Sequence, residues 1–68
     1  MAKLLSSAEV VVCLVSQGFS LVSQRGSHAK YRNADGQTVI VPMGRREIPR
    51  GTLGSIIRQS GLPKNSFG

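Results

Sequence analysis

Residues 33–36, with the sequence NADG, are the strongest fold signal in this chain of 68 residues. Asp-Gly favours the positive φ angles of a type I′ turn, which joins two antiparallel strands. The flanking residues 27–32 alternate in polarity, and residues 37–42 are β-branched and end at a proline. Residues 19–24 alternate in part, and Arg25-Gly26 is expected to form the tight turn that follows them. We therefore predict three consecutive antiparallel strands.

A helix is predicted before these strands. Ser6-Ser7-Ala8-Glu9 has the pattern of a capping box, in which Ser6 and Glu9 each satisfy the other's backbone N–H. Gly18 provides a left-handed stop. The β-branched valines between these signals also suit a strand, but the caps favour a helix. Its predicted apolar face, at i, i+3, i+4 and i+7, consists of Ala8, Val11, Val12 and Val15.

A second helix is predicted after a basic loop, residues 43–49. Pro49 suits a helix start, and Gly61 ends the helix. Gly54 weakens it by about 1 kcal/mol relative to alanine. Its narrow apolar stripe consists of Leu53, Ile56 and Ile57. Residues 63–68 are expected to be a loose tail, although Phe67 could fold back onto the core.

The order helix, three strands, helix predicts a two-layer α+β domain over residues 1–68. Both helices should cover one face of the sheet and leave the other free to meet a ligand. A domain of this size buries only about 60% of the surface that its unfolded chain exposes. A site should therefore be a surface patch or a shallow groove rather than a deep cavity.

The charge of the chain indicates an anionic partner. Nine Lys and Arg stand against three Asp and Glu, for a formal net charge of +6. Nucleic acid, an anionic membrane or an acidic protein would each suit such a surface. The charge is clustered: Arg25, Lys30, Arg32, Arg45, Arg46 and Arg50 face only Asp35 and Glu47 over the same span. The apolar run 10–15 is too short to cross a bilayer and no cleavage site follows it, so we expect a cytoplasmic protein without a membrane partner.

Several chemistries are excluded by the residues available. The three acids lie on three separate elements, whereas a two-metal nuclease needs clustered carboxylates. One cysteine and one histidine are too few ligands for zinc. No phosphate-loop glycine pattern occurs. We expect neither a metal nor a cofactor, and Cys13, in the run VVVCLV, should be a small core residue.

The single histidine, His28, lies within the stretch QRGSHAKYR. In an extended strand, side chains alternate between the two faces. His28, Lys30 and Arg32 should therefore point one way. Ala29 and Tyr31, which suit packing, should point the other. We expect the polar row on the open face of the sheet.

The neighbouring strand is harder to place. Arg25-Gly26 as a two-residue loop would put Ser23 opposite His28. Leu21 would then share the open face with the polar row, which is unfavourable, so a longer loop or a twist at the strand end is an alternative. The facing of the third strand depends on the loop length at residues 33–36, and the sequence does not fix it.

These residue types suit chemistry on RNA. The 2′-OH next to an RNA phosphodiester is a built-in nucleophile, and imidazole transfers protons at neutral pH. Flanking cations would hold the phosphate and stabilise developing charge. The candidate catalytic residue is His28, and the candidate RNA-binding residues are Arg25, Gly26, Ser27, Lys30, Arg32, Arg45 and Arg46. Two alternatives stay open: a module that binds RNA without cutting it, and a basic domain that serves only an acidic protein partner.

The chain resembles the HicA family of toxin mRNA interferases over residues 4–62. The resembling stretches are QGFSLVSQRGSHAKYRN, DGQTVIVPMG and REIPRGTLGSIIRQSGL. The family has Gly-Phe after the first helix, Gly-Ser-His entering the second strand, a hydrophobic residue and proline ending the third, and Gly-Thr-Leu opening the last helix. All four motifs are present here in that order.

The resemblance implies a fold like the double-stranded-RNA-binding domain and metal-free cleavage of mRNA in the cytoplasm, which arrests translation and growth. It places the essential histidine at His28. It also implies a HicB-type antitoxin that covers this site, with DNA contacted mainly through the antitoxin. The chain departs from the family at Ser23, where many members have arginine. It departs again at Met43-Gly44, where many have a second histidine, which leaves Arg45 or Arg46 as substitutes.

Overall fold

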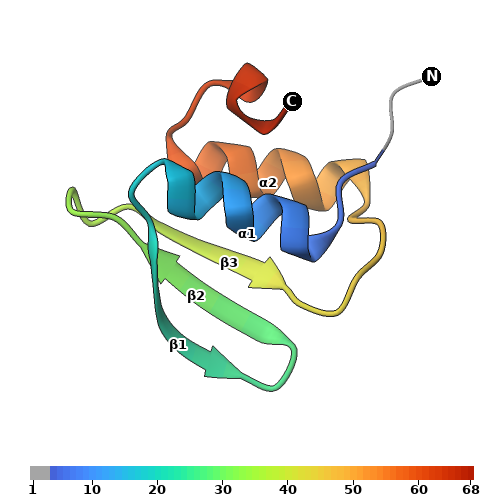
Figure 1. Cartoon of the computed structure of the whole chain (residues 1–68), viewed down its shortest axis with the longest axis horizontal. Helices are drawn as coiled ribbons and strands as arrows, with labels where there is room; N and C mark the ends of the chain where they lie inside the picture. The colour runs from blue at the N-terminus through green and yellow to red at the C-terminus, as the bar shows by residue number, and fades with distance from the viewer. Residues whose placement is uncertain (1–3) are drawn as a thin grey trace.

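The chain folds in the predicted order of helix, three strands and helix, as shown in Figure 1 by a computed structural model that describes residues 4–68. The elements are α1 (Ser7–Ser16), β1 (Ser20–Arg25), β2 (His28–Arg32), β3 (Thr38–Pro42), α2 (Arg50–Ser60) and a short 3-10 helix, η1 (Lys64–Phe67). The strands form one antiparallel sheet in the order β1-β2-β3. This is the predicted α+β architecture, and it is compatible with a double-stranded-RNA-binding-domain-like arrangement.

One face of the sheet is buried and the other is open. Both helices pack against β3, and Figure 1 shows β1 as the strand farthest from them. The buried positions of the sheet are Ala29, Tyr31, Val39 and Val41. All six residues of β1 are exposed, because this strand extends beyond the cover of the helices.

The helix α1 begins and ends where its signals predict, but it packs with a different face. The capping box is confirmed: Ser6 Oγ accepts from Glu9 N at 3.1 Å, and Glu9 Oε1 accepts from Ser6 N at 2.9 Å. The buried residues of α1 are Ser7, Val10 and Leu14, with Val11 partly buried.

The predicted apolar face of α1 is therefore wrong in phase. Val12 is 69% exposed, Val15 is 53% exposed and Ala8 is exposed as well. The helix is rich in valine, so two overlapping stripes have the spacing i, i+3, i+4, i+7. The stripe that contains Leu14 faces the core, because leucine buries more apolar area than valine or alanine.

The turn at residues 33–36 joins β2 and β3, but it is not type I′. A type I′ turn needs a positive φ at both central residues, and within residues 4–68 only glycines have one. Gly36 is the last residue of a tight turn, in which its N–H donates to Asn33 O at 3.1 Å. Its φ is 85°. This is a longer hairpin loop, in which the glycine alone takes the left-handed conformation.

The helix α2 agrees with its predicted signals. Pro49 precedes it, and Gly61 ends it in the left-handed conformation at φ 70°. Ile56 is buried, and Leu53 and Ile57 are partly buried against the core. Neither α1 nor α2 is long and apolar enough to span a bilayer, and the same holds for every helix within residues 4–68.

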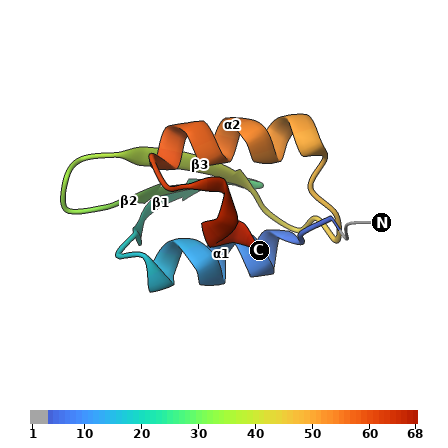
Figure 2. The ribbon, with the colours of Figure 1, turned by 90° about the horizontal axis from the view of Figure 1, so that it is seen from above.

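The C-terminal residues form the 3-10 helix η1, and Phe67 folds back onto the core, as the sequence allows. η1 lies between α1 and α2 in Figure 2, and Phe67 is only 7% exposed. The thiol of Cys13 donates to Ser66 O at 2.9 Å and ties η1 to α1. Burial of the Phe67 ring stabilises this segment by an amount on the order of 2 kcal/mol.

Candidate nucleic-acid interface

The strand β2 presents a row of polar side chains on the open face, as predicted. His28 and Arg32 are exposed and Lys30 is half-buried, while Ala29 and Tyr31 are 0% and 6% exposed. Alternate residues of a strand lie about 7 Å apart, so the row spans about 13 Å. An imidazole, an ammonium group and a guanidinium group therefore follow one another along one strand.

The turn before β2 brings an arginine beside the histidine. The two-residue turn is Gly26-Ser27, and Arg25 pairs with His28 across the strands. The predicted turn, Arg25-Gly26, and the predicted pairing of Ser23 with His28 are both wrong by register. A type II′ turn needs a positive φ at its first central residue, which Gly26 adopts at φ 58° without strain. Arg25 thus stays in the strand, on the same face as His28.

A bulge in β1 resolves the position of Leu21. Leu21 pairs with Tyr31 and Ser23 pairs with Lys30, so Val22 is an extra residue between them. Leu21 consequently has the facing of the buried Tyr31, and the expectation that it shares the open face is wrong. It is still 51% exposed, because β1 lies beyond the helices.

The strand β3 forms the other side of the open face. Pro42 pairs with His28, and Ile40, which is 38% exposed, pairs with Lys30. The N–H of Ile40 points to the free edge of β3 and donates to Gln59 Oε1 of α2 at 3.0 Å. The side chain of Gln59 thus satisfies part of the sheet edge that α2 borders.

The loop after β3 is fastened at the His28 end of the sheet. Met43 N donates to Ser27 O at 2.6 Å, which joins this loop to the turn that precedes His28. Arg45 N donates to Ser7 Oγ at 3.0 Å, and Ser7 N donates to Arg45 O at 3.0 Å. Ser7 Oγ in turn donates to Pro42 O. The exposed Arg45 and its neighbour Arg46 are therefore held at the end of the sheet that carries His28.

Ser7 is a part of this site that sequence analysis missed. It is 2% exposed and makes three hydrogen bonds to Pro42 and Arg45, which lie 35 and 38 residues away. In the sequence it looks like one more residue of a helix start. No local pattern identifies a partner at that distance.

The candidate RNA-binding residues fall into two groups. Arg25, Gly26, Ser27, Arg45 and Arg46 lie around the His28 end, and Lys30 and Arg32 continue along β2. Arg32 Nε donates to Thr38 Oγ1 at 3.2 Å, which holds Arg32 at the far end of the row. A Cβ on Gly26 would meet no atom within 4 Å, so the backbone of this turn is open to an approaching group.

The side chains around His28 at this end of the sheet are mostly cationic. Within the part of the chain that the structure describes, no group of three or more His, Cys, Asp and Glu side chains is close enough to hold a metal ion. Cys13 lies on α1, and burial raises the pKa of its thiol. It belongs to the contact with η1 and not to the open face of the sheet.

A comparison with protein families finds a match over most of the chain. The family model described as the HicA toxin of bacterial toxin-antitoxin matches residues 7–62, a range that includes every candidate residue of the interface. Comparison with individually curated proteins gives no match.

Proposed function

The chain belongs to the HicA family of toxins of bacterial toxin–antitoxin systems, and on this premise we propose that it is an endoribonuclease that cuts mRNA without a metal ion. Cleavage of mRNA in the cytoplasm would inhibit translation and growth. The observation that carries this proposal is the exposed His28 with Arg25 across from it and Lys30 beside it on one open face.

His28 acts as the general acid and base of this reaction. Its neutral imidazole accepts the proton of a ribose 2′-OH, and the 2′-oxygen forms a bond to the adjacent phosphorus. The bond from phosphorus to the 5′-oxygen breaks, and that oxygen receives a proton from the imidazolium. The products are a 2′,3′-cyclic phosphate and a free 5′-OH, and the imidazole returns to its starting form.

Cations near His28 stabilise the charge that develops on the phosphorane. Arg25 is the cross-strand neighbour of His28, and Arg45 and Arg46 lie on the loop fastened at the same end. A guanidinium group can bind two phosphate oxygens at once, and this geometry suits a charge that grows in the transition state. The chain has Ser23 opposite Lys30, so Arg25, Arg45 and Arg46 are the arginines that we assign to this task.

The remaining cations bind the RNA backbone next to the cleavage site. Lys30 and Arg32 extend the row along β2, and the open Gly26-Ser27 turn allows a phosphate to approach the backbone closely. Few aromatic side chains are present to stack on bases. Recognition would thus depend on phosphates more than on sequence.

A cleavage assay in the presence of a chelator tests the proposal. The wild type should cut single-stranded RNA, and His28→Ala should bind the same RNA without cutting it. A substrate with a 2′-deoxyribose at the cleavage position should be bound but left intact, because its nucleophile is missing. Arg58→Ala, which removes an exposed cation of α2 outside the interface, is the control and should cut at the wild-type rate.

Two outcomes would decide against this function. If His28→Ala cuts at the wild-type rate, the assignment of His28 is wrong. If the wild type binds RNA but cuts none, the chain is an RNA-binding module of the same fold.

Membership of this toxin family implies an antitoxin partner. We propose that a HicB-type antitoxin covers the open face around His28 and displaces RNA from it. Contact with DNA would then occur only through the complex of toxin and antitoxin. RNA cleavage should stop when such an antitoxin is added in excess and return when the antitoxin is removed.

A further inference from the structure

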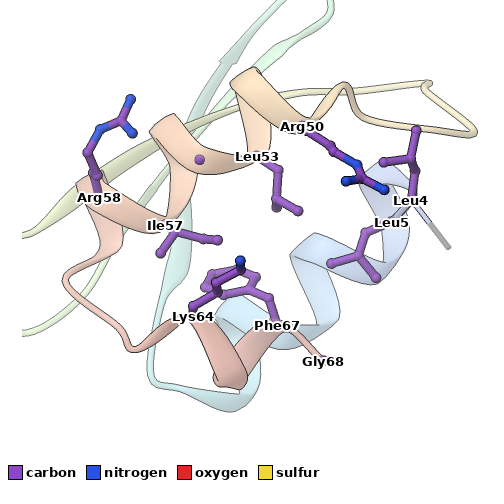
Figure 3. Close-up of a pocket in the computed structure, with 10 residues that line it drawn as sticks. Leu4, Leu5, Arg50, Leu53, Ile57, Arg58, Lys64, Phe67 and Gly68 are labelled. Carbon is purple, nitrogen blue, oxygen red and sulfur yellow. The ribbon is translucent and has the colours of Figure 1, made fainter. Parts of the chain in front are cut away.

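A groove lies between α2, η1 and the residues just before α1 (Figure 3). It encloses about 740 Å³. Its lining residues are Leu4, Leu5, Arg50, Leu53, Gly54, Ile57, Arg58, Lys64, Phe67 and Gly68. None of the candidate RNA-binding residues is among them. In Figure 1, η1 and the sheet lie on opposite sides of the helix pair, so the groove and the sheet are separate surfaces.

The walls of the groove are apolar. Figure 3 shows Leu53 and Ile57 of α2 next to the ring of Phe67, with Leu5 on the other side. Leu5, Leu53 and Ile57 are only partly buried by the chain itself. A partner that covers them would remove further apolar area from water, which favours binding.

The rim of the groove is cationic. Arg50 and Arg58 stand toward opposite ends of α2 in Figure 3, and Lys64 is on η1. The lining residues of the described chain include no acidic side chain. The groove therefore complements a partner that carries both apolar side chains and negative charge.

Gly54 leaves the backbone of α2 open along the lining of the groove. A glycine inside a helix costs about 1 kcal/mol relative to alanine, so a reason for it is expected. Its φ is not positive, and an added Cβ would meet only Arg58 Nη1, at an ordinary 3.5 Å. Nothing within the described chain thus requires glycine here. A glycine that lines a groove keeps the helix backbone open to close approach by a ligand.

We propose that this groove docks an acidic protein segment, whose apolar side chains enter between α2 and η1 while its carboxylates meet Arg50, Arg58 and Lys64. RNA fits less well, because the walls are apolar and the one aromatic ring, Phe67, is 7% exposed. A second copy of the chain would bring another net charge of +6. Residues 1–3 carry a lysine and no acid, so this segment of the chain does not complement the cationic rim either. The proposal is independent of RNA cleavage.

A designed peptide tests the groove on the full chain. The probe is a helical peptide of about four turns, with leucine at i, i+3, i+4 and i+7 and glutamate at the exposed positions. Two matched peptides replace every glutamate by glutamine or scramble the leucine positions. In an NMR titration of the ¹⁵N-labelled chain, the probe should shift the amides of Leu53, Gly54 and Ile57, and each matched peptide should bind about tenfold more weakly.

Gly54→Ala separates docking from folding, and Gly51→Ala is its matched control. Both glycines lie in α2 without a positive φ, but only Gly54 lines the groove. Both variants should therefore keep the fold or raise its melting temperature. Gly54→Ala should weaken the peptide about tenfold, the effect of one methyl group in a packed apolar site. Gly51→Ala should leave the affinity unchanged.

Three results would overturn the proposal. One is equal affinity of the probe and the scrambled peptide, which would reduce binding to net charge. Another is a set of shifts centred on the open face of the sheet instead of α2 and η1. The third is displacement of the bound probe from the groove by a short RNA, which would make the groove part of the RNA surface.

Discussion

The open face of the sheet and the groove beside α2 are both cationic, but they differ in what lies between the charges. On the sheet, His28, Lys30 and Arg32 follow one another at intervals of about 7 Å, in the alternation of a strand. In the groove, arginines stand at the ends of a wall formed by Leu53 and Ile57. A net charge attracts anions to both surfaces. The groups between the charges decide which class of anion each surface holds.

The largest expected effect is the loss of RNA cleavage at the sheet while peptide binding in the groove is kept. His28→Ala should lower the rate of RNA cleavage by about 10² to 10⁴-fold, the usual contribution of a general acid or base. Single-turnover rates with a chelator present measure it, and equal melting temperatures show that the fold is intact. Affinity of the acidic peptide for the groove should be unchanged. A parallel loss of peptide affinity would mean that the two surfaces are coupled.

Ser7→Ala should affect the sheet surface through stability and position. The change removes two hydrogen bonds of Ser7 Oγ, which donates to Pro42 O and accepts from Arg45 N. Leaving these part-buried partners unsatisfied costs about 1 to 3 kcal/mol of unfolding free energy, measurable by urea denaturation. RNA affinity should fall as well, because the loop that carries Arg45 loses its fastening.

Ser16→Ala is the matched control for Ser7→Ala. It removes an exposed serine hydroxyl from the same helix, where Ser16 Oγ donates to Cys13 O at 2.7 Å. The free energy of unfolding should change by less than about 0.5 kcal/mol. An effect of Ser7→Ala no larger than that of Ser16→Ala would show that the loop does not need this contact.

A smaller effect, the dependence of RNA affinity on salt, further distinguishes the sheet from the groove. Each phosphate contact to single-stranded RNA contributes about −0.7 to the slope of log affinity against log salt. Removing both Lys30 and Arg32 should therefore flatten the slope by about 1.4. Filter binding over a range of salt concentrations measures this, with Arg50→Ala as a cation control from the groove. An equal change of slope in Arg50→Ala would show that RNA reaches both surfaces.

Local signals in the sequence predict the elements and the polar row. The capping box at Ser6 and Glu9 is confirmed, because its groups lie three residues apart and need no tertiary partner. The alternation along β2 places Ala29 and Tyr31 inside and His28 outside, because strand geometry alone fixes the two faces. These elements and the row of His28 were therefore predictable from the sequence.

The sequence could not predict features that depend on distant segments. The face of α1 that packs is ambiguous in a run of valines until the rest of the core selects Val10 and Leu14. The facing of Leu21 depends on a bulge that the strand pattern does not signal. The groove depends on where the ring of Phe67 docks between the helices, which the sequence does not fix. The role of Ser7 depends on the loop after β3 lying beside α1.

The smallest expected effect concerns Cys13, whose thiol ties α1 to the η1 wall of the groove. Desolvation by burial raises the pKa of this thiol, and Sγ donates to Ser66 O at 2.9 Å. The thiolate is the form that reacts. Alkylation of Cys13 by iodoacetamide should therefore be slower in the folded chain than in the urea-unfolded chain. The rate in the folded chain should also rise at a higher pH than the rate in the unfolded chain. Mass spectrometry of timed samples between about pH 7 and pH 10 measures it.

Occupancy of the two surfaces should change this rate differently. The acidic peptide in the groove should hold η1 in place and slow the alkylation of Cys13 further, because Cys13 Sγ donates to Ser66 O of η1. A 2′-deoxy oligonucleotide, which the sheet should bind without cleavage, should leave the rate unchanged, because the open face does not include η1. Equal protection by both ligands would mean that binding anywhere rigidifies the whole fold. In that case the groove and the sheet are not separate surfaces in energetic terms.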